Sequence, residues 1–180
     1  FHRGHAYHIA RTREMTGCDY VVICMAGSYT QRGEAACLGK WERTRMALLN
    51  GADAVFELPA LFAVRPADAF ARGGVGVLDG LGTDVLSFGS EQGEAALLNR
   101  IADLRENEPE CVTGRIRQKL SEGQAHARAW GEAVSEYLNI DVQMLNAPNV
   151  VLGVEYIRAI HERKSNMQIN DVERLGSYHD

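Results

Sequence analysis

The chain has 180 residues, 46% apolar and 24% charged, a composition typical of one globular domain with a core of its own and not of a disordered segment. Nineteen basic against 24 acidic residues leave a net charge of −5, so the segment as a whole does not attract a polyanion such as nucleic acid. No apolar run approaches the ~18 residues of a membrane span, and four widely spaced cysteines predict free thiols in a reducing cytoplasm and no zinc knuckle.

The chain opens on FHRGHAYHIARTRE, in which two histidines bracket a glycine where a helix is predicted to begin. Between a strand and a helix this pattern suits a nucleoside triphosphate, because Gly4 lets backbone approach phosphate and the helix start offers unpaired N–H groups. His2 and His5 can donate to phosphoryl oxygens and stabilise charge on an attacked α-phosphate. Histidines also begin helices without such a role. His2, His5 and His8 recur every three residues, but zinc pairs on helices use a spacing of four, so we predict no metal site.

Strands and helices then alternate. Strands are predicted at 20–25, in ADAVFELP and in DVLSFGSE, and helices in KWERTRMALLNG and from Pro66 to Gly82, whose internal glycines indicate close packing. These spacings predict an α/β fold, a Rossmann-like doubly wound parallel sheet with its ligand crevice beyond the carboxyl ends of the strands. Further helices are predicted at 95–106, as one or two over 112–138, and after NAPN.

Cations gather in the loop after the first strand, in GSYTQRGEAACLGKWERTR. Arg32 and Lys40 flank glycines on a loop aimed at the crevice, so we interpret them as candidates for binding phosphate or carboxylate. Arg43 and Arg45 fit a solvated helix face with local ion pairs.

Three more positions are candidates for a nucleotide site. Gly89 ends the third strand and allows an adenine or ribose to approach closely, although an ordinary turn also accounts for it. Asn149, after Pro148, can read a base edge or a ribose, or it can cap the following helix. Arg174 is placed to contact phosphate.

The opening FHRGH resembles the HxGH signature of the nucleotidylyltransferase superfamily. Along the chain QRGE, KWxR, GADxVxELP, FGSE, APNVVLGVEY and RxxxYHD follow in the order seen in the tRNA(Met) cytidine acetate ligases, and the similarity covers nearly all 180 residues. The resemblance implies one nucleotidylyltransferase-like catalytic domain with additional helices in its C-terminal half. Its expected parts are a core at about 1–93, a helical extension at about 94–146 and a returning segment at 147–180.

The resemblance also implies an activity. Acetate would be activated by ATP, with Mg²⁺ as its companion, to acetyl-adenylate, and the acetyl group would pass to N4 of the wobble cytidine of elongator tRNA(Met). His2 and His5 would be catalytic, and the ATP-binding residues would be His2, Gly4, His5, Gly89, Asn149 and Arg174. Arg32 and Lys40 are candidates for holding pyrophosphate or acetate.

The chain departs from the family pattern in places. An apolar strand before HxGH and a cation-rich tRNA-binding region after Asp180 are expected to lie outside this segment, and Val150 stands where the family has a second asparagine. Two alternatives stay open. One is a small-molecule nucleotidylyltransferase that passes AMP or CMP to a phosphorylated metabolite. The other is a non-catalytic nucleotide-binding or RNA-binding module, which retention of both His2 and His5 disfavours.

Overall fold

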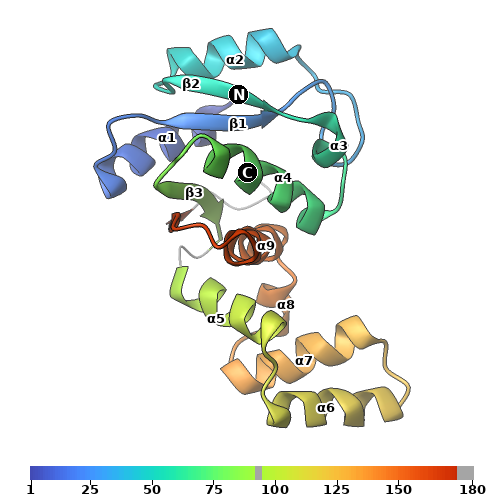
Figure 1. The fold of residues 1–180 in the computed structure, drawn as a ribbon. Helices are drawn as coiled ribbons and strands as arrows, with labels where there is room; N and C mark the ends of the chain where they lie inside the picture. The colour runs from blue at the N-terminus through green and yellow to red at the C-terminus, as the bar shows by residue number, and fades with distance from the viewer. Residues whose placement is uncertain (92–94, 174–180) are drawn as a thin grey trace.

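A computed structural model describes residues 1–91 and 95–173 (Figure 1). Its strands are β1 (Val22–Ala26), β2 (Ala54–Leu58), β3 (Val85–Ser90) and β4 (Gln168–Glu173). Its helices are α1 (Arg3–Thr16), α2 (Lys40–Leu49), α3 (Ala60–Ala63), α4 (Ala67–Gly80), α5 (Ala95–Glu106), α6 (Glu110–Ser121), α7 (His126–Leu138), α8 (Val142–Leu145) and α9 (Pro148–Arg163). The predicted α/β class with parallel strands is confirmed. None of the helices in these ranges is long and apolar enough to cross a membrane.

The strands form two parallel pairs, β1 with β2 and β3 with β4. Parallel neighbours need a crossover connection, and α2 supplies it for the first pair. The second pair is closed by the whole helical segment from α5 to α9, so β4 returns to β3 after about eighty residues of chain. Figure 1 shows the first pair above and the second pair in the middle of the molecule, with α4 between them.

One large core joins α4 to the helices that follow β3. Helix α9 packs against α4, α5 and β3, and close approach depends on Gly153, where an added Cβ would lie 2.8 Å from Phe88 Cε2. Helix α4 uses its glycines in the same way, since a Cβ on Gly73 would lie 2.4 Å from Phe62 Cβ. The close packing expected from the internal glycines of this helix is confirmed at Gly73, whereas a Cβ on Gly80 would meet nothing within 4 Å.

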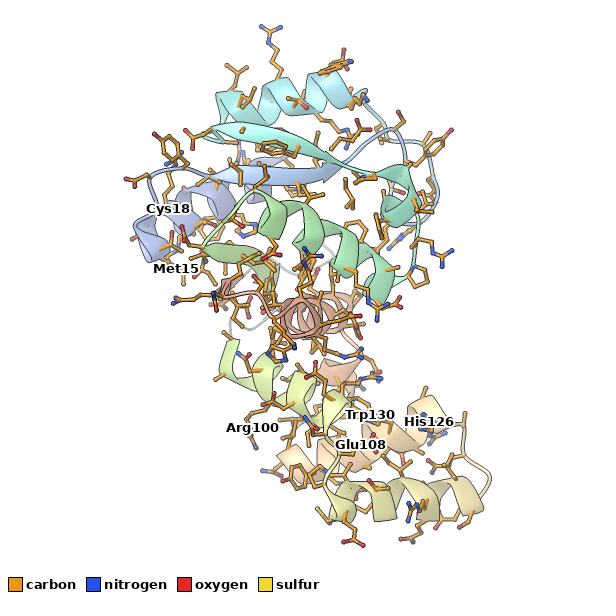
Figure 2. The ribbon with its side chains drawn as sticks, viewed as in Figure 1. Met15, Cys18, Arg100, Glu108, His126 and Trp130 are labelled. Carbon is orange, nitrogen blue, oxygen red and sulfur yellow. The ribbon has the colours of Figure 1, made fainter. Side chains whose placement is uncertain are left out.

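The helices α6 and α7 form a hairpin at the far end of the molecule from β1 and β2 (Figure 1). The Arg105 guanidinium lies 3.7 Å from the centre of the Trp130 ring, a cation–π contact between α5 and α7. Lys119 pairs with Glu132 at 2.9 Å across the hairpin. Figure 2 shows Trp130 and His126 in this helical part, well separated from Met15 and Cys18 on and after α1. The predicted helical stretch over 112–138 is thus two helices.

A smaller core lies around α1, α2 and β1, where Ile9, Val21, Ala47 and Ala52 are buried. Helix α2 forms where predicted, but several of its large apolar side chains face solvent, and Trp41 is 74% exposed. Within the described residues α2 lies on a sheet of two strands, and Ala47 is the residue that it buries in the small core.

Candidate functional site

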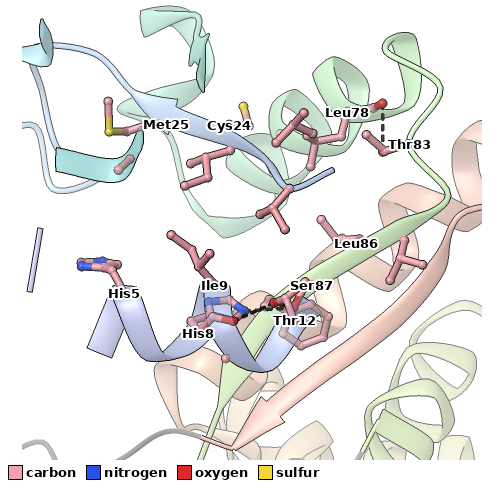
Figure 3. Close-up of a pocket in the computed structure, with 18 of the residues that line it drawn as sticks. His5, His8, Ile9, Thr12, Cys24, Met25, Leu78, Thr83, Leu86 and Ser87 are labelled. Atoms are coloured by element: carbon pink, nitrogen blue, oxygen red, sulfur yellow. Dashed lines mark hydrogen bonds between the residues drawn. The ribbon is translucent and has the colours of Figure 1, made fainter. Parts of the chain in front are cut away.

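A cleft of about 1040 Å³ separates β1 from β3. Each of these strands is paired on one edge only within the described residues, and the lining of the cleft includes all of β1 and Val85 to Gly89 of β3. Figure 3 shows β1 and β3 on opposite sides of the cavity and α1 along its floor. All five residues of β1 stay half-buried as a result. The two pairs of parallel strands are thus separated by a cleft. Ligands of α/β proteins bind in such crevices between strands.

The lining of the cleft changes along its length. The end at the carboxyl termini of the strands is polar and includes His5, Gln31, Arg43, Gly89 and Asn149. The middle has apolar lining residues such as Ile23, Leu78 and Leu86, and Asp19 and Asp84 line the end at the amino termini. Figure 3 shows His5 at the same end of the cavity as Met25, the penultimate residue of β1.

The start of α1 orders two imidazoles. Gly4 N–H donates to His2 Nδ1 at 3.1 Å, and His2 N–H donates to His5 Nδ1 at 3.2 Å, which is a capping box built from histidines. Because both Nδ1 atoms accept, the proton of each neutral ring lies on Nε2. The two rings lie 3.9 Å apart, and a Cβ on Gly4 would come within 2.9 Å of the His2 ring. Gly4 is therefore required by the cap itself.

Gly89 and Asn149, two of the candidates for the nucleotide site, both line the polar end of the cleft. Gly89 is near the end of β3, and Asn149 is in the first turn of α9, which begins at Pro148. The Asn149 amide donates from Nδ2 to Glu91 Oε1 at 2.6 Å. Glu91, which belongs to the same FGSE motif as Gly89, is a partner of Asn149 that the sequence reasoning did not name. Val150 packs in the large core and is 2% exposed.

The cations of the loop after β1 take up different places. Residues 28–36 form a tight loop closed by an antiparallel bridge between Tyr29 and Ala35, and Arg32 is exposed near its tip. Lys40 pairs with Glu57 at 2.7 Å, at the carboxyl end of β2, and neither Lys40 nor Arg32 is among the residues lining the cleft.

Arg43 enters the cleft instead of lying on a solvated face. Its Nε donates to the Leu38 carbonyl at 3.2 Å, and its guanidinium also bonds the Gly27 carbonyl directly after β1. The interpretation of Arg43 as a solvated ion-pairing residue is thus wrong, because the preceding loop folds back over α2 and presents carbonyl oxygens to it. Arg174 lies outside the described residues.

Polar groups on the α1 floor bond to β3. Ser87 Oγ lies 3.0 Å from His8 Nε2 and 2.7 Å from Thr12 Oγ1 (Figure 3). Burial lowers the pKa of His8, so its ring is neutral at pH 7. Across the cleft, burial raises the pKa of the Cys24 thiol to about 11, which keeps it protonated and unreactive. The described residues contain no group of three or more side chains arranged to hold a metal ion.

Parallel strands around a cleft, with a His-x-Gly-His helix start at its polar end, define a nucleotidyltransferase-type domain. The sequence matches the profile of the HIGH nucleotidyl transferase family over residues 1–180, and the chain belongs to this family.

Relatives and solved structures agree with this assignment. The chain is 42% identical over 177 residues to the tRNA(Met) cytidine acetate ligase of Caldicellulosiruptor saccharolyticus, and the match covers 98% of this chain and 44% of the relative. It is 44% identical to the same enzyme of Syntrophotalea carbinolica, over 100% and 44% of the two chains. A crystal structure of Thermotoga maritima TmcAL bound with alpha-thio ATP superposes with a TM-score of 0.87 at 35% identity, covering 98% of this chain and 44% of that one. The chain thus spans a little under half the length of these proteins.

Proposed function

We propose that this chain is the ATP-dependent catalytic part of a tRNA(Met) cytidine acetate ligase. The observation that carries the proposal is the histidine capping box at the polar end of the cleft, which leaves the protons of His2 and His5 on Nε2. Nε2–H groups are suitable donors for phosphoryl oxygens, and the helix start adds a positive dipole end. The relatives named above and the ATP analogue in the Thermotoga structure support the choice of ATP.

The proposed reaction has two steps. An acetate oxygen attacks the α-phosphorus of ATP, the bond to the β-phosphate oxygen breaks, and pyrophosphate leaves acetyl-adenylate behind. The N4 amine of the wobble cytidine in elongator tRNA(Met) then attacks the acetyl carbon, loses a proton and displaces AMP. His2 and His5 stabilise the charge that builds on the phosphoryl oxygens in the first step. A hydrogen-bond donor speeds this step most if it binds the transition state more tightly than it binds ATP in the ground state.

The remaining ATP contacts are proposed from motif and position. Gly89 and Asn149 hold the nucleoside end of ATP, and Arg174 contacts its phosphates. Arg32 and Lys40 receive pyrophosphate or acetate, for which Lys40 exchanges its pairing with Glu57 for the ligand. Mg²⁺ arrives with the ATP phosphates, since it is commonly bound by substrate phosphates and few protein carboxylates.

The apolar part of the cleft has another occupant in this proposal, one further parallel strand between β1 and β3. The apolar middle of the cleft runs along β1 and β3, and a strand of about five residues matches the length of β1. Such a strand joins both pairs into one sheet and satisfies their open edges. The expected division into core, helical extension and returning segment belongs to the same proposal.

Binding of tRNA is assigned mainly to parts of the protein beyond these 180 residues, because a net charge of −5 does not favour binding of a polyanion. The substrate is a tRNA, so we place the protein in the cytoplasm.

The test is ATP–pyrophosphate exchange by the full-length protein, with and without acetate. Exchange should require acetate, and His5→Ala should lower its rate at least ~100-fold, the usual scale for deleting a transition-state donor. His126→Ala, on the exposed side of the helical hairpin, is the matched control and should leave the rate unchanged.

The same assay separates the alternatives. Exchange that ignores acetate but responds to a phosphorylated metabolite would replace the ligase with a small-molecule nucleotidylyltransferase. ATP binding without any exchange would leave a nucleotide-binding module.

A further inference from the structure

His8 is a third histidine of the opening helix, and the proposed chemistry gives it no task. It lies one turn after His5 and lines the floor of the cleft. Its ring hydrogen-bonds to β3, with Nε2 3.0 Å from Ser87 Oγ.

Ser87 is the centre of a four-residue network that joins three elements. Besides His8, its Oγ lies 2.7 Å from Thr12 Oγ1 on α1 and 3.1 Å from Asn170 Nδ2 on β4. Thr12 Oγ1 is also 2.8 Å from the His8 carbonyl oxygen, to which it donates. One turn of α1 is therefore bonded to β3 through Ser87, which also accepts from Asn170 on β4.

One assignment of protons satisfies every member. Because the Thr12 proton goes to the His8 carbonyl, the Ser87 hydroxyl donates to Thr12 Oγ1. The two lone pairs of Ser87 then accept from Asn170 Nδ2 and from His8 Nε2. His8 is thereby a donor at Nε2, and the lowered pKa caused by burial keeps its ring neutral.

The hydrogen bonds of this network fix the position of α1 along β3. The neighbouring face of α1 contributes Ile9 to the small apolar core near β1, and apolar contacts of this kind are not directional. Hydrogen bonds are directional, so the polar side fixes the rotation and the axial position of the helix. Ser87 is two residues before Gly89 on β3, and His8 is three residues after His5 on α1.

We propose that His8 and Ser87 are positioning residues, which hold His5 in place opposite Gly89 at the nucleotide end of the cleft. This inference rests on the proposed function, because it assigns these two residues to the step in which His5 acts on the ATP phosphates. Misplacement of a catalytic group by about 1 Å can cost ~100-fold in rate.

The experiment measures acetate-dependent ATP–pyrophosphate exchange in full-length protein for four variants, with melting temperature recorded for each. Ser87→Ala and His8→Phe remove the network but leave His5 intact. His8→Gln keeps a donor close to the position of Nε2. Ser121→Ala, an exposed hydroxyl at the end of α6, is the control.

The expected result is a loss in kcat of about 10- to 100-fold for Ser87→Ala and His8→Phe, with KM for ATP within about threefold of wild type. His8→Gln should retain kcat within about threefold, and Ser121→Ala should match wild type. Equal kcat values for His8→Phe and His8→Gln, or an unchanged kcat for Ser87→Ala, would overturn the inference. Lack of exchange in the wild-type protein itself would instead count against the proposed function.

Discussion

Around α1, α2 and β1 the described residues bury four side chains in one apolar cluster, whereas the cluster built on α4, β3 and the later helices buries twenty-four. The catalytic candidates His2 and His5 begin a helix of the first region, and the second region supplies Gly89 and Asn149. The site therefore lies between a thinly packed part and a densely packed part of the chain.

The stability of the N-terminal region therefore depends on what fills the cleft. Its strand β1 is half-buried throughout and paired along one edge, so a neighbouring strand or a ligand adds both apolar burial and hydrogen bonds. The helical region has already buried its apolar faces and has less to gain. Local openings should accordingly be more frequent around α1 and β1 than around α7 and α9.

Two isoleucine truncations give the largest expected contrast. Ile157 on α9 is 1% exposed, so Ile157→Ala should lower the free energy of unfolding by about 2 to 5 kcal/mol. Ile23→Ala, on half-buried β1, should cost less than half as much because its surroundings are already open. Urea unfolding of this 180-residue chain measures both, because in the full-length protein the proposed further strand would cover Ile23. Equal losses would mean that the two regions do not differ in packing.

Two glycine substitutions in α4, the helix between the two strand pairs, compare a tightly packed position with an open one. Gly73→Ala places a Cβ 2.4 Å from Phe62 Cβ, which cannot move without shifting α3, so we expect a loss of about 1 to 3 kcal/mol. Gly80→Ala on the same helix meets nothing within 4 Å and should gain up to about 1 kcal/mol from helix propensity. Melting temperatures compare the pair, and a stabilised Gly73→Ala would contradict the packing of α3 on α4.

The cleft region should respond to mild acid through His8. Its folded pKa is below the ordinary value of 6.5, so the unfolded chain takes up a proton first and stability falls as the pH drops below about 6.5. His8→Gln has no such proton to take up. If wild type is the more stable protein at pH 7.5, the difference in free energy of unfolding between wild type and His8→Gln should therefore be smaller at pH 5.5. A constant difference would show that His8 has the same pKa in both states.

The helical hairpin should respond at lower pH, and by the smallest amount. Hydrogen bonds from Arg128 and Lys119 lower the pKa of Glu132 to about 2, below its ordinary 4.5. Its contribution to stability is present above pH 4.5 and is lost as the pH falls toward 2. Glu132→Gln should remove this part of the acid sensitivity of α6 and α7, measured by helical circular dichroism between pH 5 and 3. An identical acid profile would mean that the ion pairs contribute nothing.

Much of the fold could be predicted from the sequence, because β1, β2 and β3 are short apolar runs and α4 and α5 carry clear helical periodicity. Strand β4 was missed. The buried side of QINDVE includes Asp171, which is 5% exposed and bonds Ser90 Oγ at 2.7 Å, and a buried carboxylate hides the apolar pattern of a strand. No local signal shows that this segment returns to pair with a strand about eighty residues earlier.

The candidate site could be predicted where a motif carries its own chemistry. His2, Gly4 and His5 are three neighbours whose mutual contacts follow from their spacing. The direction of a loop cation does not follow in this way. Arg43 enters the cleft and Lys40 pairs with Glu57 because of how residues 28–39 fold back, and this tertiary arrangement leaves no trace in the spacing.

The most direct test of the account is hydrogen–deuterium exchange of the full-length protein with and without ATP. We predict that ATP slows exchange in α1, β1 and the first turn of α9, which border the polar end of the cleft, and leaves α6 and α7 unchanged. His5→Ala should weaken that protection. Protection confined to α6 and α7, or none in α1 and β1 while ATP is bound, would contradict the assignment of this cleft as the nucleotide site.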